Sequence, residues 1–103
     1  MTLSLGSSAY HLDILTLKKR NAVSVEFYIS DDKSIYHKLL PHREEIEADI
    51  GFDLDWRELP DKKASRIIIE KPVNLDEYDE WNSQFDWIID MCVRFKKAFK
   101  KYV

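Results

Sequence analysis

The clearest hydrophobic pattern in the chain lies near its C-terminus, over residues 81–102. Apolar side chains recur there at alternating gaps of four and three: Trp81, Phe85, Ile88, Cys92, Phe95, Phe99 and Tyr102. This spacing places them on one side of an α-helix, so the pattern predicts a helix with a single apolar stripe. Because aromatic rings bury large areas, we expect another layer of the protein to cover this stripe.

A second pattern, the alternation of apolar and polar residues, predicts strands over residues 10–17 and 22–29. The alternation is cleanest in the later strand, where Val23, Val25, Phe27 and Ile29 point to one face. A polar break separates the two strands and ends in Asn21, a residue type that tolerates a positive φ. We therefore expect an antiparallel hairpin.

Helical spacing returns after the polar residues 30–32, whose side chains can cap a helix. The apolar positions are Ile35, Tyr36, Leu39, Leu40, Ile46 and Ile50, and Gly51 is a suitable helix end. Pro41 lies inside this pattern and removes one helical hydrogen bond. We favour one kinked helix, because the apolar stripe resumes in phase after the proline. A break, with Pro41 in the first turn of a second helix, is the alternative.

Two more strands are predicted over residues 54–59 and 64–71, separated by a Pro-Asp-Lys-Lys turn. The consecutive Ile67, Ile68 and Ile69 indicate that both faces of the later strand are at least partly covered.

The predicted fold is α+β, with a four-stranded antiparallel sheet and two helices on one face in the order ββαββα. It has two layers. Residues 1–8 form a flexible lead-in and residues 9–103 a single α+β domain. The last helix would bring Phe85, Ile88, Cys92, Phe95 and Phe99 against Val23, Val25, Phe27, Trp56 and Ile67.

Composition supports a folded domain, since the 103 residues are 45% hydrophobic and 13% aromatic. The formal net charge of -3 disfavours a dedicated nucleic-acid binder, because such domains are usually basic. The only cysteine, Cys92, can form no internal disulfide and fits a reducing compartment. The sequence has no secretory signal pattern and no apolar run long enough to span a membrane, so we expect a cytoplasmic protein.

Several segments of the chain resemble a known family. They are Val25–Asp32, Arg43–Gly51 and Trp56–Ile67, together with Glu80-Trp81, Trp87, Arg94-Phe95 and Phe99. The run Leu-Pro-Asp-Lys-Lys-Ala-Ser-Arg is the most specific part. These residues resemble the bacterial and archaeal family catalogued as domain of unknown function 4268. The resemblance implies a C-terminal module that often follows a restriction-endonuclease-like nuclease domain, in defence or nucleic-acid biology. It implies no catalytic residues.

No residue pattern points to catalysis in this chain. The histidines, His11, His37 and His42, lack the spacing of paired metal ligands. A restriction-endonuclease-like site needs Asp or Glu, any residue, then Lys, and Glu70-Lys71 lacks the intervening residue. We therefore expect no metal, no cofactor and no enzymatic activity. An uncharacterised enzyme is the last alternative.

One candidate binding surface is the flank of the last helix beside the apolar stripe, formed by Trp87, Met91, Arg94 and Ala98. Trp and Met are enriched at protein interfaces, which favours docking to a partner. A wide-faced, half-buried helix is the alternative.

The other candidate surface is basic and comprises Lys18, Lys19, Arg20, Lys62 and Lys63 in two hairpin turns. If both turns reach the same edge of the domain, these cations can position phosphates without reading bases. Solvated turns are the alternative.

The sequence thus favours a non-catalytic accessory module. We expect it to dock to a nuclease-like domain of its own or another chain, or to self-associate as a homodimer. Weak, sequence-independent nucleic-acid binding through the basic turns is the first alternative.

Overall fold

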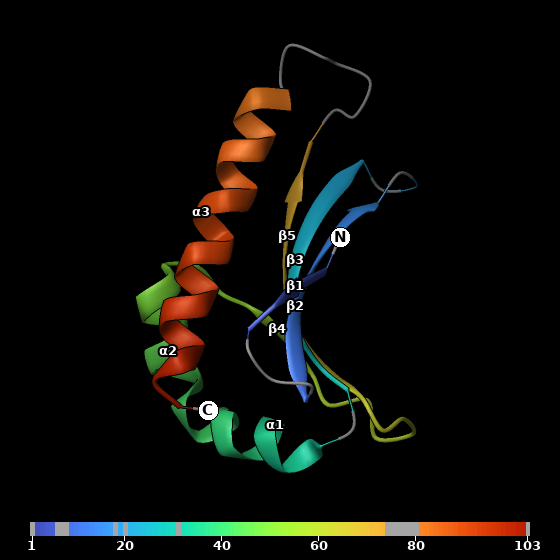
Figure 1. Ribbon diagram of the computed structural model, residues 1–103, viewed down its shortest axis with the longest axis vertical. Coiled ribbons are helices and arrows are strands. Elements are labelled where there is room, and N and C mark those ends of the chain that lie inside the picture. The colour runs from blue at the N-terminus through green and yellow to red at the C-terminus, as the bar shows by residue number, and fades with distance from the viewer. Residues whose placement is uncertain are drawn as a thin grey trace.

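The computed structural model describes residues 2–5, 9–17, 19, 21–30, 32–73 and 81–102. Five antiparallel strands form one sheet in the order β1-β2-β3-β5-β4. The strands are β1 (Thr2–Ser4), β2 (Tyr10–Leu17), β3 (Ala22–Ile29), β4 (Asp55–Arg57) and β5 (Ser65–Pro72). The α-helices are α1 (Lys33–Leu39), α2 (Arg43–Ile50) and α3 (Trp81–Lys100). Helices α2 and α3 lie on one side of the sheet, and α1 crosses its lower end (Figure 1). The α+β class and the antiparallel sheet are therefore confirmed.

The sheet has five strands, so the predicted count of four is wrong, and so is the order ββαββα. The additional strand, β1, lies in the segment that we assigned to a lead-in. Its three residues pair with β2, with Leu3 opposite Leu12. Three residues are too few to show a reliable alternation, and β1 is specified by a neighbouring strand edge rather than by its own pattern.

The first hairpin agrees with the sequence prediction. Strands β2 and β3 have the predicted bounds, and they pair antiparallel with Leu12 opposite Phe27. Asn21 before β3 has a φ of 46°, in the left-handed region that asparagine tolerates. The three consecutive isoleucines of β5 are all buried, as predicted for a strand covered on both faces.

The helical segment around Pro41 is broken rather than kinked, so the favoured prediction of one continuous helix is wrong. A 3-10 turn at Leu40–His42 separates α1 from α2, and Pro41 stands at its beginning. Proline is tolerated there because its missing N–H would have no helical partner. The predicted start of the segment at residues 30–32 and its predicted end at Gly51 are confirmed. The Asp32 carboxylate accepts a hydrogen bond from the Ser34 N–H at 3.0 Å, and Gly51 ends α2 at a φ of 91°.

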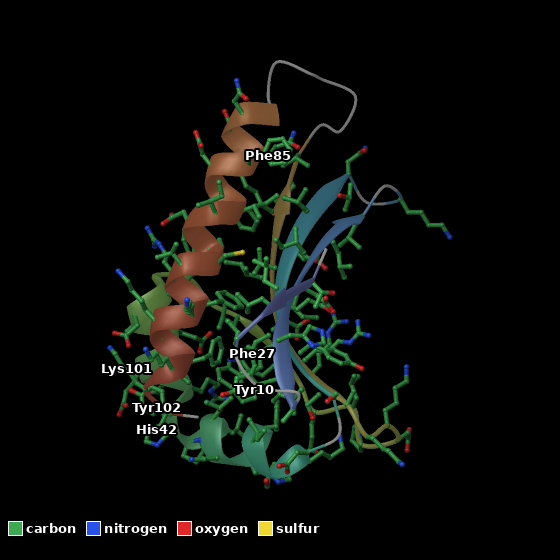
Figure 2. All side chains as sticks on the ribbon, in the orientation of Figure 1. Tyr10, Phe27, His42, Phe85, Lys101 and Tyr102 are labelled. Atoms are coloured by element: carbon green, nitrogen blue, oxygen red, sulfur yellow. The ribbon has the colours of Figure 1, made fainter. Side chains whose placement is uncertain are left out.

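The core forms between α3, the neighbouring α1 and α2, and one face of the sheet, as Figure 2 shows around Phe27. Phe99 stacks on Phe27 with 4.4 Å between ring centroids, and Phe95 lies against Phe99 at 5.4 Å. Phe95 and Phe99 are both buried, as predicted. The half-buried Ile88 and Cys92 pack against the same cluster.

Phe85 departs from the prediction, because its side chain is 55% exposed. Residues seven apart on an ideal helix differ by about 20° in direction, so Phe85 lies roughly 40° around α3 from Phe99. The buried face of α3 is turned the other way and includes Met91 and Ala98. A straight stripe with a period of 3.5 residues therefore does not stay over the sheet for the whole helix.

Candidate functional site

The predicted docking flank of α3 is not a single surface. Met91 and Ala98 are each 1% exposed and belong to the core, so their assignment to an accessible partner-binding flank is wrong. Their burial agrees with the wide-faced helix that we considered as the alternative. The reason is the rotation of α3, which turns these two side chains toward the interior.

The other two flank residues are held by neighbouring elements. Trp87 is half-buried, and the Lys71 Nζ of β5 lies 5.8 Å from the centroid of its ring. The Arg94 Nη1 donates a hydrogen bond to the Ile50 carbonyl oxygen at 2.6 Å, and its Nε donates to Asp90 Oδ1 at 3.1 Å. The last carbonyls of a helix lack intrahelical partners, so Arg94 satisfies one at the end of α2 and joins α2 to α3.

The apolar residues that α3 exposes lie along a different line. Phe85, Ile89 and Val93 are 55%, 61% and 46% exposed, respectively. They are spaced four apart, so they form one ridge along the helix, which we call the α3 ridge. The i, i+4 spacing of these three residues was visible in the sequence, but the direction in which α3 faces the sheet was not.

The basic turns do not form the predicted five-cation patch. Ala22 of β3 pairs with Pro72 of β5, and Ile29 pairs with Ser65, so the two hairpin turns lie at opposite ends of the sheet. Figure 1 shows this separation. Strands of eight residues hold the two turns roughly 23 Å apart, at about 3.3 Å per residue. Lys18 and Arg20 lie outside the described residues; Lys19, Lys62 and Lys63 are exposed.

Lys33 at the start of α1 organises the turn between β4 and β5. Its Nζ donates hydrogen bonds to the carbonyl oxygens of Leu59 at 2.9 Å and Ala64 at 3.2 Å, and also to that of Glu58. One lysine therefore satisfies three backbone acceptors across this turn, which includes Leu59 at a φ of 57°. No pattern in the sequence predicts this role for Lys33.

The face of the sheet opposite the helices carries a cluster of charged side chains. Glu26 in the central strand β3 is only 2% exposed, and its Oε1 lies 3.4 Å from Arg66 Nη1. Burial raises the pKa of the Glu26 carboxyl, and the neighbouring Arg66 guanidinium opposes this shift. His11 Nε2 lies 3.3 Å from Asp13 Oδ2, and Arg66 covers the Tyr28 ring at 5.3 Å. Glu26 and Arg66 pair between β3 and β5, whereas His11 and Asp13 pair within β2, so we interpret the cluster as a stabilising network.

Within the described part of the chain, no three potential metal-ligating side chains lie together. His37 contacts Glu58, whereas His42 contacts Glu45 at 3.4 Å, so these two histidines serve separate pairs. No helix among the described residues is long and apolar enough to cross a membrane.

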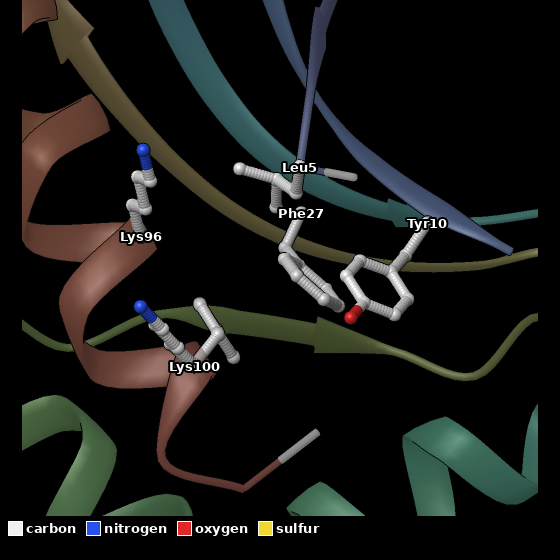
Figure 3. Close-up of a pocket in the computed structure, with 6 residues that line it drawn as sticks. Leu5, Tyr10, Phe27, Lys96 and Lys100 are labelled. Carbon is white, nitrogen blue, oxygen red and sulfur yellow. The ribbon is translucent and has the colours of Figure 1, made fainter. Parts of the chain in front are cut away.

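A pocket opens between the C-terminal half of α3 and the beginning of β2 (Figure 3). Its volume is about 380 Å³, and its lining combines aromatic and aliphatic side chains with two lysines: Leu5, Tyr10, Phe27, Lys96, Phe99 and Lys100. No sequence pattern predicts this pocket, because its residues come from three separate segments. The visible signal was the i, i+4 spacing of the two lysines.

Comparison with known proteins identifies the family but no closer relative. The sequence model of the family described as "Domain of unknown function (DUF4268)" matches residues 1–103, the whole chain. Neither the curated proteins nor the solved structures include a significant match. The chain therefore belongs to the DUF4268 family.

Proposed function

We propose that this chain is a non-catalytic interaction module that docks to another domain through the α3 ridge. The observation that carries the proposal is the exposure of Phe85, Ile89 and Val93, between 46% and 61%, on a helix whose adjacent face lies in the core. Connected apolar patches on small soluble domains usually mark interaction sites. Of the flank suggested by the sequence, Trp87 and Arg94 lie on the other side of the buried face.

The partner that we propose is a restriction-endonuclease-like domain, tethered in the same chain or supplied by another chain. The family resemblance suggests this class of partner. A tethered partner is also favoured by the small size of the ridge. Three half-exposed side chains supply far less than the roughly 800 Å² per partner of a stable interface between free proteins. A tether raises the effective concentration to about the millimolar range, where a small contact suffices.

A cytoplasmic location is part of this proposal. Cys92 has no disulfide partner among the described residues, and burial raises the pKa of its thiol. A protonated, half-buried thiol is suited to a reducing compartment and resists oxidation.

Nucleic-acid binding through the hairpin turns has less support from the structure than from the sequence. The described turn lysines lie at opposite ends of the sheet, so they do not act as one patch. No contact in the described residues favours an enzymatic role over docking.

Docking can be tested with Ile89→Asp, which places a charge in the middle of the α3 ridge. With a restriction-endonuclease-like domain supplied at about millimolar concentration, to match the effect of a tether, sedimentation should show a complex for the unmodified protein and weaker association for the variant. Ser83→Asp is the matched control, because Ser83 is exposed on the same helix but points away from the ridge. Circular dichroism should show that both variants are folded.

Equal association of the Ile89→Asp and Ser83→Asp variants would contradict docking through the ridge. Self-association of the chain alone, lost in Ile89→Asp, would assign a second copy as the partner instead.

A further inference from the structure

The pocket at the C-terminal half of α3 combines an aromatic floor with two cations at its rim. We propose that it binds a small amphipathic anion, with an apolar body of about ten atoms and one anionic head group. This inference goes beyond docking through the α3 ridge and does not depend on it.

The floor of the pocket is a continuous layer of rings. Tyr10 stacks on Phe27 with 5.2 Å between ring centroids, and Phe27 stacks on Phe99 at 4.4 Å. Phe27 and Phe99 are 0% and 1% exposed and lie behind the pocket surface, whereas the half-buried Leu5 and Tyr10 present the accessible apolar surface (Figure 3). A flat apolar group that enters the pocket can therefore lie against the Tyr10 ring and the Leu5 side chain, which the buried phenylalanines support from behind.

The size of the pocket is that of a small-molecule site. Its volume of about 380 Å³ lies within the range of roughly 300–1,000 Å³ that is usual for ligand pockets. At about 30 Å³ for each water-sized group, this space holds roughly a dozen non-hydrogen atoms. A two-ring body with a small head group meets this limit.

The rim supplies the charge. Lys96 and Lys100 are four residues apart on α3, and both line the pocket. Like charges at this spacing repel each other, and an anion between them relieves the repulsion. Neither ammonium group forms an ion pair with any residue that the structure describes, whereas Lys101 of the same segment pairs with Asp49 at 3.0 Å. Among the residues that the structure describes, no acidic side chain lines the pocket.

Tyr10 adds one neutral donor at the floor. Among the described residues, its hydroxyl makes no hydrogen bond, and its ring lies in the pocket (Figure 3). The pocket thus offers two ammonium groups and one hydroxyl around an apolar base, which favours a carboxylate or similar anion on an aromatic body over a neutral or cationic ligand.

The probe is 2-naphthoate, and 2-naphthamide is its neutral counterpart of the same shape. Titration followed by amide chemical shifts should show saturable binding of 2-naphthoate, with shifts centred on residues 5, 10, 96 and 100. We expect 2-naphthamide to bind at least about tenfold more weakly, because it cannot form charge-assisted hydrogen bonds with the lysines. Binding of 2-naphthoate should also weaken with added salt.

Lys96→Gln combined with Lys100→Gln should reduce 2-naphthoate affinity about tenfold and leave 2-naphthamide affinity unchanged. Lys97→Gln is the matched control, since Lys97 is an exposed lysine of the same helix turn that does not line the pocket. Equal binding of the two probes, shifts centred elsewhere, the same loss in Lys97→Gln, or no saturable binding at millimolar probe would each overturn the proposal.

Discussion

The two borders of the buried face of α3 differ in what touches them. On the border toward α2 and β5, Trp87 lies under Lys71, and Arg94 donates a hydrogen bond to the Ile50 carbonyl. On the opposite border, Ile89 and Val93 of the α3 ridge are 61% and 46% exposed. The border that carries Trp87 and Arg94 therefore makes contacts with other elements of the same domain. Residue types that are enriched at protein interfaces can therefore serve tertiary contacts, and an interaction surface must be judged by exposure.

The largest expected difference is in stability, between a substitution on the buried face of α3 and one on the α3 ridge. Phe95→Ala removes a side chain that is 0% exposed and should cost about 3–5 kcal/mol of unfolding free energy. Domains of this size have only about 5–15 kcal/mol in total, so this variant should be close to unfolding. Phe85→Ala is the same chemical change on the same helix, and at 55% exposure it should cost about 1 kcal/mol or less.

Urea denaturation of the two variants measures this difference directly. Equal losses of stability would show that Phe85 is packed as tightly as the buried face of α3 and would remove the basis for the ridge.

A smaller effect should come from the border that is tied to α2. Arg94→Gln loses the hydrogen bond to the Ile50 carbonyl and should cost about 1 kcal/mol, since the arginine is partly screened by solvent. Lys97→Gln on the same helix should leave the urea midpoint within error. A midpoint for Arg94→Gln that matches this control would mean that the hydrogen bond between α3 and the end of α2 adds no stability.

The smallest effect concerns Cys92, which lies between the buried face and the ridge. Burial raises the pKa of its thiol, so less thiolate is present at any given pH than in an exposed cysteine. Alkylation by iodoacetamide should be slow near neutral pH and should still accelerate above the ordinary thiol pKa of about 8.5. A rate that is half-maximal at about pH 8.5 would mean that the Cys92 thiol has the pKa of an exposed cysteine.

The same reagent can report docking. A partner on the α3 ridge should slow the alkylation of Cys92 further, because the thiol lies beside Ile89, three residues away on the helix surface. Unfolded chain in urea, where burial is lost, is the control for full reactivity.

Local pattern determined much of the fold. Alternation alone located β2 and β3 with their observed bounds, and the apolar period located the helix that became α3. The cap at Asp32 and the end at Gly51 were also predictable. These features depend on interactions between residues close in sequence, which periodicity and side-chain chemistry report directly.

Tertiary structure decided the rest, including which residues come together at each candidate site. The pairing of β1 with β2, the opposite ends reached by the basic turns and the meeting of Leu5, Tyr10 and Lys96 in one pocket depend on strand register and helix placement. The rotation of α3 about its axis decided whether Met91 or Phe85 was buried. A helix with apolar residues over more than half of its circumference can face the sheet in more than one direction. The packing of its neighbours selects one of these directions. The spacing of apolar residues within α3 does not predict which direction that is.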